Sequence, residues 1–128
     1  MSHLFGHHYN YRWPVQLSLV TLEPHDLTPR TGLPGETDVP GLYAYLLLKA
    51  RDVLGEEWYV EEARRALEGL RGLNFEIGYQ FNNVAWSATA CARMWKETGD
   101  SYYLGMCYCL LASFFHNTIL WEPDYGLT

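Results

Sequence analysis

Apolar residues in the second part of the chain recur at the spacing of helices that bury one side. The pattern predicts four helices, at about 39–54, 57–71, 83–97 and 101–120. The clearest apolar stripe lies in the second of these and consists of Tyr59, Ala63, Ala66, Leu67 and Leu70. Glycines follow the first three predicted helices, at Gly55, Gly72 and Gly99, where this residue commonly ends a helix. The expected fold class is therefore all-α.

The first 37 residues lack this helical period. Residues 15–19 (VQLSL) alternate apolar and polar side chains, which predicts a short strand. Residues 23–41 are rich in proline and glycine, which predicts a long loop. At its end Thr37 or Asp38 is expected to cap the first helix, with Pro40 in the first turn. The chain thus divides into an irregular N-terminal arm, 1–37, and a helical repeat region, 38–128.

An internal repeat relates the two halves of the helical region. Residues 49–63 align with residues 93–107 at an offset of 44 residues, so that Gly55 matches Gly99 and Tyr59 matches Tyr103. The matches cluster at the turn between two predicted helices. Two copies of one helical hairpin are therefore expected.

The run from Tyr102 to Trp121 contains no charged residue, and its 20 residues are long enough to cross a bilayer. Its repeat partner, residues 58–77, carries several charges, among them Glu61 and Arg64. A helix in the same structural role is therefore compatible with water. We expect a helix buried in protein rather than a membrane span, with His116 as a hydrogen-bonded core histidine.

The net charge of −6 argues against a nucleic-acid partner, which would call for a basic surface. The three cysteines, Cys91, Cys107 and Cys109, form no CxxC pair, so buried free thiols are expected rather than disulfides or a zinc site. The first residues lack the features of a signal peptide, which favours a cytoplasmic protein if Met1 is the true start.

Three histidines near the start, His3, His7 and His8, have a spacing found in metal sites. No helix is predicted there to bring them onto one face. The sequence therefore predicts no metal and no cofactor.

Antiparallel helices place alternate loops at opposite ends of a helical array. Residues 30–40, 73–83 and 121–128 should share one end, which we call the rim, while the turns at 55–57 and 99–101 share the other. The rim combines carboxylates, amides and aromatic rings, a set of groups suited to binding sugars. The predicted substrate-binding residues are Glu36, Tyr79, Asn82, Asn83, Trp121, Glu122 and Tyr125. Asp38 and Asp124 are the predicted catalytic pair, since two carboxyl groups can cleave a glycosidic bond.

Structural roles for the same residues stay open. Acidic residues before a helix, such as Glu36 and Asp38, are commonly caps. Residues 123–126 (PDYG) also make an ordinary turn sequence. Tyr79 and Trp121 can equally fill a core.

The stretches KARDVLGEEWYVEEARRALEGL (49–70) and ARMWKETGDSYYLGMCYCLL (92–111) resemble the helix-turn-helix units of the (α/α) toroid superfamily. This group contains six-hairpin glycosidases and related polysaccharide lyases and epimerases. The resemblance covers about residues 38–120 and lies at the level of fold, since no catalytic motif matches residue by residue. It implies a site in a central cleft, lined by the loops that enter the inner helices, here the first and third.

The leading hypothesis is part of a carbohydrate-active toroid protein, similar to a glycoside hydrolase or polysaccharide lyase. Such proteins have about six hairpins, and two are predicted here, so the other hairpins would come from a longer chain or from self-association. The alternative is a helical-hairpin scaffold or protein-interaction module without catalysis. An enzyme needs accessible, converging carboxylates at the rim, whereas a scaffold would use them as caps and turns.

Overall fold

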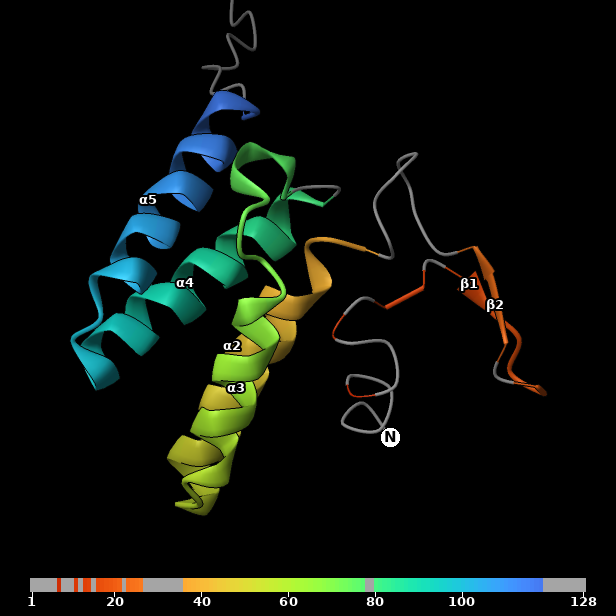
Figure 1. The fold of residues 1–128 in the computed structure, drawn as a ribbon, viewed down its shortest axis with the longest axis horizontal. Helices are drawn as coiled ribbons and strands as arrows, with labels where there is room; N and C mark the ends of the chain where they lie inside the picture. The colour runs from red at the N-terminus through yellow and green to blue at the C-terminus, as the bar shows by residue number, and fades with distance from the viewer. Residues whose placement is uncertain are drawn as a thin grey trace, which may run out of the picture.

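A computed structural model describes residues 7, 11, 13–14, 16–21, 23–26, 36–77 and 80–118. Within these residues the chain forms four α-helices in two antiparallel hairpins and one small two-stranded sheet (Figure 1). The predicted all-α fold class is therefore confirmed.

The four helices are close to the ranges predicted from periodicity. The first hairpin consists of α2 (Val39–Leu54) and α3 (Trp58–Glu68), and the second of α4 (Phe81–Thr98) and α5 (Ser101–His116). A short 3-10 helix, η1 (Asn74–Glu76), lies between the hairpins. The bounds of α2 match the prediction, whereas α3 and α5 end earlier and α4 begins two residues earlier.

The early end of α3 has a local cause. From Gly69 to Arg71 each backbone N–H bonds to the carbonyl three residues back, which tightens the α-helix into turns. Gly72 then adopts a φ of 81°, a conformation that disfavours residues with a Cβ atom. The helix therefore ends over several residues rather than at Gly72 alone.

The N-terminal arm contains a small hairpin. Strand β1 (Gln16–Leu17) lies within the predicted strand and pairs antiparallel with β2 (Pro24–Asp26), with Gln16 opposite Asp26. The loop predicted from residue 23 onward is wrong at β2. Ser18 starts the reversal, because its hydroxyl accepts hydrogen bonds from the backbone N–H groups of Val20 and Thr21 at 3.2 Å.

The predicted start of the first helix is confirmed in position, with Asp38 as the N-cap residue and Pro40 in the first turn, but the expected side-chain capping bond is absent. Neither Thr37 nor Asp38 bonds its own helix through its side chain. The Thr37 hydroxyl donates to the Glu76 carbonyl, and the Asp38 carboxylate accepts from the Gln80 N–H. Both side chains therefore hold the start of α2 to the segment that leads into α4. At α5, by contrast, Asp100 caps its own helix by accepting from the Tyr102 N–H at 2.9 Å.

The core lies between the inner helices α2 and α4 and their outer partners. Helix α2 packs on both α3 and α4, and α4 packs on α5, whereas α3 makes few contacts with α4. The α2–α3 and α4–α5 connections lie on the lower side of the view in Figure 1, opposite the end of α5. The largest fully buried apolar side chains are Leu48, Leu67, Leu70, Met94 and Leu110.

Helices α2 and α4 approach closely at Gly41. A Cβ atom placed there would lie 1.8 Å from the Ser87 hydroxyl oxygen and 2.8 Å from the Ser87 Cα atom. The second distance involves backbone, so no side-chain rotation relieves the clash. Glycine at position 41 thus fixes the separation of the two inner helices.

Helix α5 has a buried side, with Tyr103, Cys107 and Leu110, and an exposed side, with Tyr108 and Phe115. No helix in the described part of the chain has the length and apolarity to cross a membrane. All three thiols are free, as expected, with Cys91 and Cys107 buried and Cys109 half-buried. Burial raises the pKa of the Cys91 thiol to about 12.

Replacing Gly41 with alanine should destabilise the protein by about 1–3 kcal/mol, because the added methyl group forces α2 and α4 apart. Urea unfolding of the wild type and of Gly41→Ala measures this change. Gly105→Ala is the matched control, since a Cβ atom in that helical glycine meets nothing within 4 Å. The close approach of α2 to α4 is refuted if Gly41→Ala is as stable as Gly105→Ala.

Candidate functional site

The described part of the rim brings four of the predicted residues to one end of the inner helices. Asp38 immediately precedes α2, while Asn82 and Asn83 lie in the first turn of α4. The turn glycines Gly55 and Gly99 follow the opposite ends of the same two helices. Glu36 lies two residues before Asp38, and its backbone N–H donates to the Trp13 carbonyl of the N-terminal arm at 2.8 Å.

Asp38 is the most buried of these residues, with 0% of its surface exposed. Its Oδ2 atom accepts hydrogen bonds from the Gln80 N–H at 2.7 Å and from the Asn83 amide at 3.4 Å. Its Oδ1 atom is buried without a hydrogen-bond partner among the described residues. The carboxylate also lies at the N-terminus of α4, where the helix dipole favours negative charge. Asp38 therefore orders the rim, and its catalytic role stays a prediction.

Glu36 is half-buried beside Asp38. Partial burial raises the pKa of the Glu36 carboxyl, and the negative charge of Asp38 raises it further. A carboxyl group whose pKa is raised by burial and by a neighbouring negative charge is a feature of acid–base sites. Asn82 differs from both, because it is exposed and faces a groove on α4 rather than the Asp38 carboxylate.

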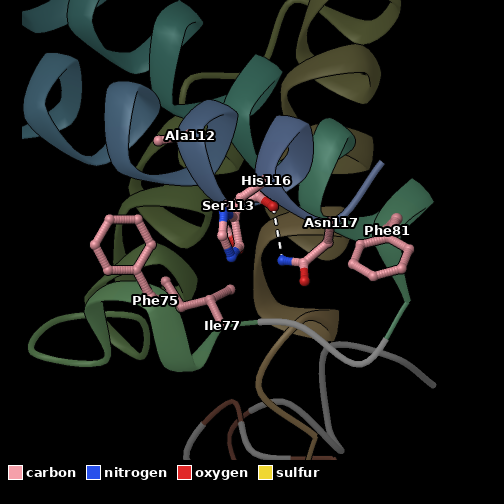
Figure 2. Close-up of a pocket in the computed structure, with 7 residues that line it drawn as sticks. All are labelled: Phe75, Ile77, Phe81, Ala112, Ser113, His116 and Asn117. Carbon is pink, nitrogen blue, oxygen red and sulfur yellow. Dashed lines mark hydrogen bonds between the residues drawn. The ribbon is translucent and has the colours of Figure 1, made fainter. Parts of the chain in front are cut away.

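A cavity of about 580 Å³ opens at the same end of the molecule. It is lined by Phe75, Ile77, Phe81, Ala112, Ser113, His116 and Asn117. Figure 2 shows the Phe75 and Phe81 rings on either side of the hollow, with His116 and Asn117 between them. The Asn117 amide donates to the Ser113 carbonyl at 2.8 Å, which orients its side chain at the end of α5. The hollow thus combines two aromatic walls with polar groups on a helix end.

His116 corrects an expectation from the sequence. The apolar run around it predicts a core histidine, but His116 is exposed and lines this cavity. Leu110 and Ser113 lie on the buried side of α5, whereas His116, at the C-terminal end of the helix, lies outside it. In the sequence, the two polar residues near the end of the uncharged run, His116 and Asn117, are the feature that could have indicated this cavity.

Five predicted site residues lie outside the described residues. They are Tyr79, Trp121, Glu122, Asp124 and Tyr125. Sequence reasoning missed the cavity residues Phe75 and Phe81 individually, although both belong to the aromatic stretch LNFEIGYQF (73–81) that marks the rim loop.

A second polar cluster lies on the outer side of α2 and α3. The buried carboxylate of Glu62 accepts a hydrogen bond from the Tyr11 hydroxyl at 3.0 Å and lies 3.1 Å from the His7 ring nitrogen. Burial, and then the hydrogen bond to Glu62, raises the pKa of Tyr11. Through these contacts Glu62 fixes the N-terminal arm to α3. His3 and His8 lie outside the described residues.

The described residues contain no group of three or more His, Cys, Asp or Glu side chains arranged to hold a metal ion. In comparisons with known proteins, no family model, curated protein or solved structure matches the chain. The candidate site is therefore defined by its geometry and its chemistry.

Asp38→Ala should destabilise the protein by about 1.5–3 kcal/mol, since the mutation removes the charged acceptor of a partly buried hydrogen bond from the Gln80 N–H. Chemical denaturation measures the change. Asn82→Ala provides the control at the neighbouring, exposed rim position and should alter stability by less than about 0.5 kcal/mol. Equal effects of the two substitutions would contradict the ordering role of Asp38.

Glu36→Gln should make the protein progressively more stable than the wild type as the pH rises from about 3 to about 7. The reason is that the folded pKa of Glu36 lies above its ordinary value of 4.5, so ionisation of this carboxyl costs stability above that pH. Thermal unfolding across this range measures the difference.

Glu68→Gln is the control of opposite sign. The hydrogen bond from Arg71 lowers the pKa of Glu68, so the ionised carboxyl adds stability that is lost as the pH falls. This variant should therefore become less stable than the wild type as the pH rises. A Glu36→Gln profile parallel to that of Glu68→Gln would rule out the unfavourable environment of Glu36.

Proposed function

We propose that the chain is part of a carbohydrate-active (α/α) toroid protein, of a glycoside hydrolase or polysaccharide lyase type, and that the rim binds its sugar. The observation that carries the proposal is the cavity of about 580 Å³ at the rim. Its volume falls within the range of small-molecule sites, which is about 300–1,000 Å³. The Phe75 and Phe81 rings offer flat apolar surfaces for the C–H faces of a sugar ring.

Polar groups around these rings suit the hydroxyls of an oligosaccharide. His116 and Asn117 lie in the cavity wall, and Glu36 and Asp38 lie in the neighbouring part of the rim. The raised pKa of Glu36 favours a proton donor, because a carboxyl that retains its proton to a higher pH can act as a general acid. In this proposal Asp38 and Asp124 remain the predicted acid–base pair, with Glu36 adjacent to Asp38.

One observation favours the alternative, a non-catalytic scaffold. Asp38 is buried and bonds the backbone of the next helix, which is how a scaffold would use a rim carboxylate. The two proposals therefore differ in the role of Asp124, which takes part in glycan cleavage only if the protein is an enzyme. Loss of glycan turnover in Asp124→Asn, with folding intact, supports the enzyme. Unchanged turnover in both Asp38→Asn and Asp124→Asn removes them as catalysts.

Phe81→Ala should weaken binding of an oligosaccharide about tenfold, because one aromatic wall of the cavity is lost. A glycan array of neutral and uronate-containing oligosaccharides identifies the ligand, and calorimetric titration gives the affinities. Trp95→Ala is the matched control on the same helix. Its side chain is 39% exposed against 44% for Phe81, and it lies near the Gly99 end of α4.

Equal loss of affinity in the two variants would contradict binding at the rim. Absence of binding to every oligosaccharide by the folded wild type would contradict the carbohydrate proposal itself.

A further inference from the structure

The repeat found in the sequence is also a repeat of structure. Gly55 after α2 and Gly99 after α4 both have a φ of 72°. Their N–H groups bond at 2.8 Å to the carbonyls of Arg51 and Trp95, which are themselves 44 residues apart. Positions separated by 44 residues therefore occupy equivalent places on α2 and α4.

Four of the contacts that join α2 and the residue before it to α4 and the residue before it involve identified groups. At the rim the Asp38 carboxylate binds the Gln80 N–H, and further along Gly41 lies against Ser87. The next contact joins the rings of Tyr45 and Trp86, whose centroids lie 4.6 Å apart. Near the turn the Asp52 carboxylate accepts from the Arg93 guanidinium at 2.7 Å. On the side of the first hairpin these four contacts are made by Asp38, Gly41, Tyr45 and Asp52.

The equivalents of these residues on α4 are exposed or, for Ala85, half-buried. They are Asn82, Ala85, Thr89 and Lys96. The first three line a groove of about 400 Å³, together with Trp86 and Phe114. Exposure differs accordingly between the two copies. Asp38 is fully buried whereas Asn82 is exposed, and Leu70 on the first hairpin is buried whereas its equivalent Phe114 is only half-buried.

We propose that this groove on α4 receives the inner helix of a further hairpin of the same repeat, lying parallel to α4 as α4 lies to α2. Lys96 is the equivalent of Asp52, which accepts a hydrogen bond from Arg93. Because a basic residue replaces the acidic one, the incoming helix carries a carboxylate at its own equivalent of Arg93. Ala85 is the equivalent of Gly41, which lies against Ser87. Because alanine adds a methyl group at this close approach, the incoming helix carries glycine at its own equivalent of Ser87. Ala85 in the groove thus specifies the size of the partner. Lys96 lies beyond the groove, in a hollow lined also by Asp52 and Arg93, and specifies the charge of the partner near the turn.

A second copy of this chain does not meet these requirements. In the same register its α2 would bring Lys49, the equivalent of Arg93, against Lys96, which places like charges together. It would also bring Tyr43 against Ala85. The Tyr43 ring is covered by the N-terminal arm, with the Trp13 ring at 5.2 Å. The arm therefore closes one side of the pair of hairpins, and α4 leaves the other side open.

A third hairpin joined after residue 124 of the chain tests the proposal. A copy of residues 81–117 follows residue 124, so that each residue of the copy lies 44 positions after its original. The copy carries Ser87→Gly and Arg93→Glu. A disulfide reports docking, from Thr89→Cys in the chain and Trp86→Cys in the copy, which reproduce the Tyr45–Trp86 contact. Cys109→Ser is included throughout, because that thiol is half-buried.

In a glutathione buffer the disulfide should be about fivefold more stable with Arg93→Glu in the copy than with arginine retained there. Lys96→Glu in the chain should reverse this order, since the favourable partner then becomes arginine. Arg64→Glu, on the outer helix α3, carries the same change of charge and should leave the order unchanged.

Failure of the disulfide to form in an extended chain that is helical by circular dichroism would overturn the proposal. An order that Lys96→Glu does not reverse would also overturn it. The unextended chain carrying Leu42→Cys and Thr89→Cys tests a second copy as the occupant. An intermolecular disulfide of equal stability there would assign the groove to self-association. The test is independent of sugar binding, because it measures the open side of α4 and not the rim cavity.

Discussion

The buried carboxylate of Asp38 joins the two hairpins at the end where the candidate site lies. It binds the backbone N–H that precedes α4, so the start of the second inner helix is positioned by a side chain that precedes the first. The hydrogen bond from the Thr37 hydroxyl to the Glu76 carbonyl reinforces the same joint. The aromatic cavity depends on this arrangement, because Phe75 and Phe81 flank the segment that the joint holds. A change at Asp38 should therefore alter the rim even where Asp38 touches no ligand.

A second constraint acts further along the inner helices. Gly41 allows the backbones of α2 and α4 to approach until Ser87 fills the space of a missing side chain. The pair formed by Asp52 and Arg93 then closes the interface near the turns. The hydrogen bond from Arg93 lowers the pKa of Asp52 and outweighs the opposing effect of desolvation. The interface is thus polar at both ends and closely packed between them.

The sequence predicts the helices well because their signals are local. Glycines at positions 55 and 99 and the apolar period around Leu67 act within a few residues of the structure they form. The side-chain roles of Asp38 and Glu62 could not be read in this way. Asp38 precedes a helix and Glu62 lies within one, yet each carboxylate bonds a segment about 40 or more residues away. Such partners depend on how the hairpins and the arm fit together in three dimensions, and a local pattern does not specify that arrangement.

The two copies of the repeat differ at the position of the carboxylate that joins the hairpins. Asp38 offers a charged acceptor to the positive end of α4, whereas its equivalent, Asn82, offers a neutral amide oxygen. Hydrogen bonds to a charged acceptor are about twice as strong as those between neutral groups. A further hairpin on α4 would therefore be held less firmly at the rim than α4 is held on α2. More of its specificity would then come from the opposite end, where the charge of Lys96 discriminates between an acidic and a basic partner.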